Sequence, residues 1–124
     1  MIGYVTLGTN DFAKAAAYYD ALLAELGGKR FMDMETFIAW GNNPAAPMLS
    51  IIKPFNGEAA SSGNGTMVAL AADSPTTVDR VYKKAIDLGS KDEGAAGPRG
   101  DSGFYAGYFR DVDGNKLCVF CMSK

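Results

Sequence analysis

The sequence predicts an α+β fold made of two β-α-β-β-β modules, which form a cup-shaped, mostly antiparallel sheet with helices on the outer face. Strand-like and helix-like stretches follow one another in the same order in both halves of the chain. Matching residues of the two halves are also separated by the same number of positions in every pair. The matching pairs are Val5 with Val68, Leu7 with Leu70, and Tyr19 with Tyr82. In addition, LGGK at 26–29 matches LGSK at 88–91.

The first half predicts a strand, a helix and three further strands. Residues 3–8 are rich in β-forming residues, and Asn10 or Asp11 can cap the helix that follows. Apolar residues then recur at helical spacing until Gly27-Gly28 ends the helix. They are Phe12, Ala15, Ala16, Tyr19, Leu22, Leu23 and Leu26. The three further strands are expected near residues 30–33, at 36–40 and at 47–52.

The second half predicts the same order. Residues 66–72 form a strand, and Asp73 or Ser74 caps a helix that has Pro75 in its first turn, where a missing N–H costs little. Gly89 ends that helix, and the Gly-rich segment 92–103 is expected to be a loop. Two strands at 104–110 and 115–120, joined by an Asp113-Gly114 turn, close the chain.

The chain length fits one compact domain. It has 124 residues, which is too short for two ordinary domains. We therefore expect a single domain over residues 1–124, with module one at 1–53, a linker at 54–64 and module two at 65–124.

Composition argues against several classes of function. The 12 basic and 14 acidic residues do not provide the basic surface that nucleic-acid binding requires. No stretch approaches the roughly 20 apolar residues that cross a bilayer, and the start lacks the pattern of a signal peptide. With only two cysteines, these features predict a cytoplasmic protein. The chain contains no histidine, the commonest metal ligand and proton shuttle.

Alternation along the strands gives each module two different faces. One face is aliphatic and is expected to pack under the helices. It carries Val5, Leu7, Leu49, Ile51, Val68, Leu70, Leu117 and Val119. The other face mixes aromatic, sulfur-bearing, small and hydroxylated side chains, which suits the lining of a ligand cavity. It carries Tyr4, Thr6, Met48, Ser50, Met67, Ala69, Cys118 and Phe120. A dimer interface or a second packed layer is the alternative.

The paired modules, the opening YVTLGTND-x-x-x-A-x-x-YY-D and the closing YFRDVDGNKLCVF resemble the vicinal oxygen chelate superfamily. This superfamily includes glyoxalase I, bleomycin-resistance proteins and extradiol dioxygenases. The resemblance covers nearly the whole chain, and the DxDGN turn before the last strand is its most recognisable part. It implies a cup formed by two modules and, for a chain of this size, a homodimer.

In enzymes of that superfamily, His, Gln or Glu from the first and last strands of each module bind a divalent metal. The matching positions here are Tyr4, Ser50, Met67 and Cys118. The family often has His in place of Tyr4 and Met67, and Glu in place of Cys118. A phenol, a hydroxyl, a thioether and a thiol are poor ligands for hard cations, and zinc needs three or four protein ligands together. We therefore predict no metal site and no cofactor.

Aromatic and cationic residues near the strand ends are further candidates. Trp40 and Tyr105 can stack on a planar ligand, and Arg99 or Arg110 can pair with an anionic one. Core packing is the alternative for the aromatics, and pairing with a neighbouring aspartate is the alternative for Arg110.

The sequence thus predicts a small-molecule-binding protein of the glyoxalase/bleomycin-resistance type. The expected ligand-binding residues are Tyr4, Trp40, Ser50, Met67, Tyr105 and Cys118. The alternative is a glyoxalase- or dioxygenase-like lyase or oxidoreductase with atypical or metal-free chemistry. Its proton-transfer group would be Tyr4, Tyr105 or Cys118, and the pKa of that group would have to move toward neutrality. A ligand-free structural or regulatory dimer is a third possibility.

Overall fold

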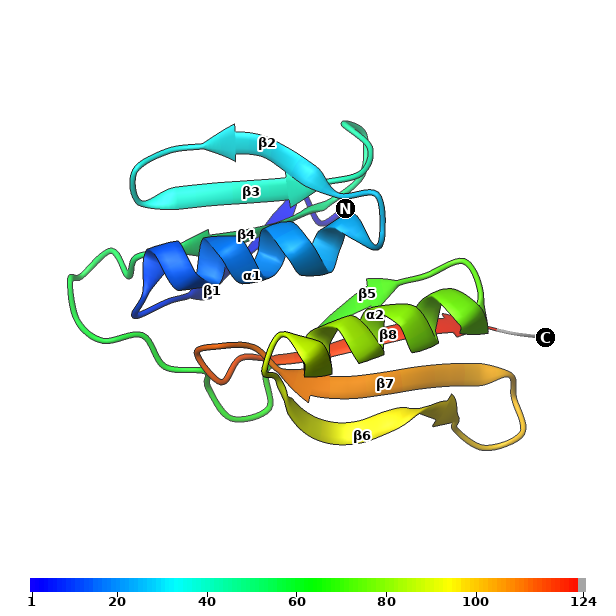
Figure 1. Ribbon diagram of the computed structural model, residues 1–124. Coiled ribbons are helices and arrows are strands. Elements are labelled where there is room, and N and C mark those ends of the chain that lie inside the picture. Colours follow the sequence, from blue (N-terminus) through cyan, green and yellow to red (C-terminus); the bar gives the residue numbers. More distant parts are fainter. Residues whose placement is uncertain (123–124) are drawn as a thin grey trace.

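The computed structural model describes residues 1–122, which form two helices and eight strands (Figure 1). The first half contains β1 (Tyr4–Gly8), α1 (Phe12–Ala24), β2 (Lys29–Asp33), β3 (Phe37–Gly41) and β4 (Met48–Ile52). The second half contains β5 (Val68–Ala71), α2 (Pro75–Asp87), β6 (Lys91–Pro98), β7 (Phe104–Arg110) and β8 (Lys116–Met122). Within residues 1–122, neither helix is long and apolar enough to cross a membrane.

Each half of the chain forms its own four-stranded sheet, and this confirms the predicted α+β class. The strand orders are β1-β4-β3-β2 and β5-β8-β7-β6. In each sheet the first and last strands pair in parallel and the other neighbours are antiparallel. The two helices lie side by side in front of the sheets (Figure 1).

The strand register reproduces the sequence repeat. In the first sheet Thr6 lies opposite Ser50, and in the second sheet Ala69 lies opposite Cys118. Both helices also begin with a side-chain cap: Asp11 accepts a hydrogen bond from the backbone N–H of Lys14, and Ser74 accepts one from Thr77. The sequence left two capping residues possible for each helix. The structure shows that Asp11 caps α1 and that Ser74 caps α2.

One strand differs from the prediction. The segment 92–103, expected to be a loop, contains most of β6. Its residues are mostly small and have low β-propensity, and its register shifts on both sides of Gly94, which has a φ of +149°. The segment is a strand because its backbone pairs with β7 at the edge of the sheet, and tertiary pairing overrides weak local propensity there.

A single core lies between the helices and the two sheets. The predicted aliphatic face packs there. Leu7, Leu49, Ile51, Leu117 and Val119 are buried, and Val5, Val68 and Leu70 are partly buried against the same cluster. Burying each large aliphatic side chain contributes roughly 1.5–3 kcal/mol. The core therefore joins the two halves and fixes which face of each sheet is turned away from the helices.

The Asp-Gly turn between β7 and β8 also connects the halves. Asp111 is buried and accepts hydrogen bonds from the backbone N–H groups of Asp113 and Asn115 and from the Tyr19 hydroxyl of α1. Asp113 in turn accepts a 2.9 Å hydrogen bond from the backbone N–H of Asn10. The turn therefore docks module two onto the β1–α1 connection.

Candidate functional site

The sheet faces turned away from the helices, here called the far faces, carry the mixed set of side chains. A Cβ on Gly107 would lie 2.9 Å from the α2 residue Tyr82, so position 107 points toward the helix and Tyr108 points away from it. Residues opposite each other in register share a face. On this basis the far face of module one carries Tyr4, Thr6, Phe37, Ala39, Met48 and Ser50. That of module two carries Ala69, Phe104, Ala106, Tyr108, Cys118 and Phe120.

Ser50 lies at the centre of the far face of module one. It is fully buried, between Thr6 of β1 and Ala39 of β3 in the register. Its Oγ has no hydrogen-bond partner among residues 1–122. Nearby, Tyr4 is 59% exposed and contacts Phe37 edge-on, with ring centroids 6.1 Å apart. A buried hydroxyl without a partner has an unused capacity to donate and accept.

Cys118 occupies the equivalent position of module two. It is buried, and Tyr108 lies opposite it in register. Burial raises the pKa of the Cys118 thiol, and this outweighs a hydrogen bond with Tyr108 and the positive charges of Arg99 and Lys116, which act to lower it. The thiol is therefore protonated at neutral pH and behaves as a small apolar side chain with a weak donor.

Four of the six predicted ligand-binding residues map to the far-face side of the sheets, and two do not. Tyr4, Ser50 and Cys118 lie on the far faces, and Met67, just before β5, is 41% exposed. Trp40 and Tyr105 point toward the helices. The Trp40 indole donates to Asp20 of α1 at 2.9 Å, and the Tyr105 hydroxyl donates to Asp79 of α2 at 2.7 Å. Both aromatic side chains therefore lie on the helix side of the sheets, opposite to the face that carries Ser50 and Cys118.

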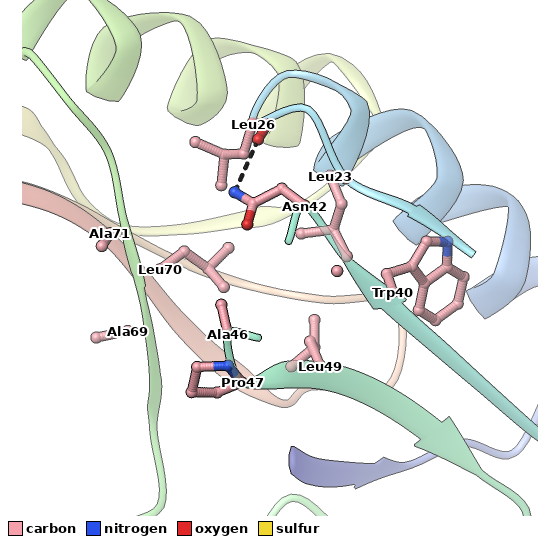
Figure 2. Close-up of a pocket in the computed structure, with 12 residues that line it drawn as sticks. Leu23, Leu26, Trp40, Asn42, Ala46, Pro47, Leu49, Ala69, Leu70 and Ala71 are labelled. Atoms are coloured by element: carbon pink, nitrogen blue, oxygen red, sulfur yellow. Dashed lines mark hydrogen bonds between the residues drawn. The ribbon is translucent and has the colours of Figure 1, made fainter. Parts of the chain in front are cut away.

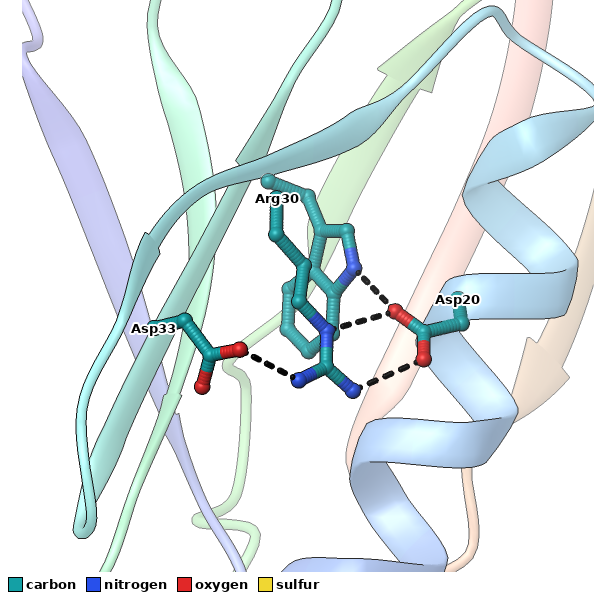
Figure 3. Close-up of polar contacts among 4 residues, drawn as sticks. Asp20, Arg30 and Asp33 are labelled. Carbon is teal, nitrogen blue, oxygen red and sulfur yellow. Dashed lines mark hydrogen bonds and ion pairs between the residues drawn. The ribbon is translucent and has the colours of Figure 1, made fainter.

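An ion-pair network that the sequence did not indicate joins Arg30 to Asp20 and Asp33 (Figure 3). The Arg30 guanidinium donates to both carboxylate oxygens of Asp20, at 2.9 and 2.7 Å, and to Asp33 at 2.9 Å. The guanidinium carbon lies 5.9 Å from the centroid of the Trp40 ring. The hydrogen bonds from Arg30 are the main reason that the pKa of Asp20 is lowered. Every charge here has a partner within the chain, so the network fixes β2 against α1.

Arg110, a candidate anion partner, is also paired within the chain. It donates to Glu93 of β6 at 2.9 Å, and no ion pair joins it to a neighbouring aspartate within residues 1–122. The sequence had offered pairing of Arg110 with a neighbouring aspartate as the alternative. In the structure Arg110 instead links β7 to β6.

Two cavities follow the seam between module one and β5. The first, of about 310 Å³, lies beside the end of α1 and includes Leu23, Trp40 and Asn42 (Figure 2). The second, of about 360 Å³, includes Met67. The residues common to both are Pro47, Leu49, Ala69 and Leu70. Neither of these two cavities is lined by Tyr4, Ser50 or Cys118.

The fold and its repeated register define a protein of paired β-α-β-β-β modules, and comparisons with known proteins agree. A glyoxalase/bleomycin resistance protein from Albidiferax ferrireducens is 33% identical, with 98% of each chain covered and a TM-score of 0.88. Two more distant structures share the fold. A lactoylglutathione lyase from Agrobacterium tumefaciens is 19% identical, with 98% of this chain and 92% of that one covered and a TM-score of 0.71. A genomically encoded fosfomycin resistance protein from Listeria monocytogenes is 15% identical, with the same coverage and a TM-score of 0.73.

The family model of the Glyoxalase/Bleomycin resistance protein/Dioxygenase superfamily matches residues 1–119. No curated protein sequence matches the chain at a significant level. The match to the family model spans nearly the whole chain, and the chain therefore belongs to this superfamily.

The side chains present do not fit the divalent metal that the superfamily implies. At the four positions that resemble the family's ligand positions, the donors are the phenol of Tyr4, the hydroxyl of Ser50, the thioether of Met67 and the protonated thiol of Cys118. Within residues 1–122, no group of three or more His, Cys, Asp or Glu side chains is placed to hold a metal ion. Hard divalent cations prefer carboxylate and imidazole ligands.

Proposed function

We propose that this protein binds a small molecule on the far faces of its sheets, and that it does so as a homodimer. The observation that supports this most is the composition of those faces. A sheet with one solvated face normally alternates apolar residues inward with polar residues outward. Here the outward positions of β4 hold Met48 and Ser50, and those of β8 include Cys118 and Phe120. These side chains suit a ligand cavity with a few polar groups.

Exposed apolar side chains at the rims of these faces support the homodimer. The exposed fractions are 45% for Met32, 59% for Tyr4, 41% for Met67 and 60% for Met122. Tyr4, Met32 and Met122 lie opposite far-face residues in register. Large exposed apolar side chains grouped on one face favour a binding partner, and methionine adapts its shape to varied ligands. A second copy that covers these rims would enclose the ligand between far faces.

Binding is favoured over catalysis by the state of the candidate proton-transfer groups. Burial raises the pKa of Cys118, and the hydrogen bond to Asp79 raises that of Tyr105. Both shifts move the pKa away from neutrality, whereas a proton-transfer group works best when its pKa lies near the working pH. Sequestration of a ligand needs only shape, apolar walls and a few hydrogen bonds.

A ligand screen tests the proposal at Ser50. Compounds that raise the melting temperature of the wild-type protein are titrated by calorimetry into the wild type and the Ser50→Ala variant. We expect dissociation constants roughly 3–10 times larger for Ser50→Ala, because the substitution removes the hydroxyl and introduces no larger side chain.

The control is Thr36→Val, which removes an exposed hydroxyl outside the far faces and should leave affinity unchanged. Light scattering should give twice the 13.1 kDa chain mass. A screen without a single stabilising compound would contradict ligand binding, and a monomer at all concentrations would contradict the dimer.

A further inference from the structure

Two cations on the far face of module two have no carboxylate partner within the described residues, 1–122. Of the four arginines, Arg30, Arg80 and Arg110 form ion pairs. Arg99 instead donates to backbone carbonyls, chiefly those of Ala95 at 2.6 Å and Gly97 at 3.1 Å, with a longer contact to that of Pro98. Lys116 forms no ion pair within residues 1–122 either. The chain has a formal net charge of −2, so this local positive charge is opposite in sign to the net charge of the molecule.

Both cations lie over the ring of one tyrosine. The guanidinium carbon of Arg99 is 5.4 Å from the centroid of the Tyr108 ring, and the Lys116 ammonium is 5.6 Å from it. Gly94 permits this packing, because a Cβ there would lie 3.3 Å from the Arg99 Nη2 and 3.2 Å from Tyr108. Carbonyls hold Arg99 in place through Nη1 and Nη2, while its Nε–H and one Nη2 hydrogen have no acceptor within residues 1–122. Because both charges lie within 5.6 Å of the ring centroid, a bound anion near the ring would be attracted by both.

The same face becomes aromatic away from the cations. Phe104 and Phe120 have ring centroids 5.8 Å apart, and Ala106 lies opposite Phe120 in register. Along β8, Lys116 and Phe120 are separated by about 13 Å, at roughly 3.3 Å per residue. Between them the buried Cys118 adds no charge. The face is therefore cationic at one end, neutral in the middle and aromatic at the other end.

We infer that this face binds a small organic carboxylate, with its carboxylate between Arg99 and Lys116 and its apolar body directed toward Phe104 and Phe120. The inference rests on the proposed function and names the ligand class for the far face of module two. A carboxylate matches the planar donor geometry of the guanidinium, and the aromatic pair accepts an aryl or alkyl body of matching length.

Calorimetry with three probes tests this assignment. The probes are 4-phenylbutyrate, its neutral analogue 4-phenylbutan-1-ol, and inorganic phosphate. The variants are Lys116→Met and Arg99→Gln. The matched control is Lys53→Met, because the Lys53 ammonium also lies over an aromatic ring, 5.9 Å from the centroid of Phe12, in module one. Circular dichroism melts establish that each variant is folded.

We expect 4-phenylbutyrate to bind about tenfold or more tightly than the alcohol and than phosphate, since a charge-assisted contact and an apolar body act together. Lys116→Met should weaken its binding about tenfold, added NaCl should weaken it too, and Lys53→Met should leave it unchanged. Folded Arg99→Gln should show a similar loss, and the Lys116→Met result decides the matter if Arg99→Gln unfolds.

Four outcomes would overturn the inference. Equal binding of the acid and the alcohol, or unchanged affinity in Lys116→Met, would show that charge is not recognised, while small-molecule binding itself would stand. Phosphate binding as tightly as 4-phenylbutyrate would assign the cluster to inorganic anions. Absence of binding by both phenyl compounds would reject this ligand class, and the general screen at Ser50 would then decide the proposed function by itself.

Discussion

Tyr19 and Asp111 form a buried hydrogen bond between the two modules. Tyr19 is fully buried in α1, and Asp111 is 7% exposed in the turn after β7. Burial and the negative charge of Asp111 raise the pKa of Tyr19 well above its ordinary value, so the hydroxyl stays a donor. Tyr82, its counterpart in the repeat, donates to Asp92 within module two. The same repeated residue thus joins the modules in one half and stabilises a single module in the other.

At this position we expect Tyr19→Phe to destabilise the protein by about 1.5–3 kcal/mol, because a buried carboxylate loses a donor. Urea unfolding monitored by circular dichroism measures the change. Tyr18→Phe is the matched control. Its hydroxyl forms a 2.6 Å hydrogen bond with the partly buried Ser90, and its loss should cost about 1 kcal/mol. Both bonds join α1 to module two, but only Asp111 is charged, so equal effects of the two substitutions would show that the charge of Asp111 adds nothing to the link.

Alternation along the strands was enough to place Ser50 and Cys118 on a common type of face. It gave no face for Trp40 and Tyr105, because the sequence repeat aligned the first and last strands of each module but left the middle strands β3 and β7 unaligned. Lys116 was not singled out, since a lone lysine beside a turn has no sequence signal. Its proximity to Tyr108 depends on the pairing of β7 with β8.

At the scale of single elements, β2 is an edge strand held to α1 largely through Arg30. The Arg30 and Asp20 side chains are 32% and 45% exposed, so solvent screens their attraction and the pair contributes about 1 kcal/mol or less. Because the pKa of Asp20 is lowered in the folded state, its contribution is present above its unfolded pKa of about 3.9 and is lost as the pH falls through the folded value.

We therefore expect Arg30→Met to destabilise the protein by roughly 0.5–1 kcal/mol at pH 7. The difference from wild type should shrink as the pH falls below about 4, the unfolded pKa of aspartate, and on through the lower folded pKa of Asp20. Urea unfolding at several pH values, at constant ionic strength, measures this. A difference that stays constant down to pH 2 would show that Arg30 acts through packing on Trp40 and not through Asp20.

The elements were predictable to different degrees. Both helices have capping residues and a clear apolar stripe, so their positions followed from the sequence. β6 was missed because Gly94, Ala95 and Ala96 carry no strand signal and because the strand depends on β7 for its hydrogen bonds. A strand of this kind is defined by its partner and not by its own residues.

At the scale of the whole molecule, two surfaces are candidates for the ligand site. The seam between module one and β5 has two cavities, of which one includes Leu23 and Asn42 (Figure 2). Within residues 1–122, the far faces have the Ser50 hydroxyl without a hydrogen-bond partner and two cations near Tyr108 without an ion pair. The proposed function assigns ligand binding to the far faces, and the proposed homodimer would supply the enclosure that a single chain lacks there.

The most direct measurement is a map of backbone amide chemical shifts, recorded by NMR on the isotope-labelled protein during titration with a compound that the screen identifies. We predict that the largest changes fall at far-face positions of β1, β4 and β8, including Thr6, Ser50 and Cys118. Changes concentrated instead at Leu23, Asn42 and Ala46 would place the ligand in the seam cavity and contradict the far-face assignment.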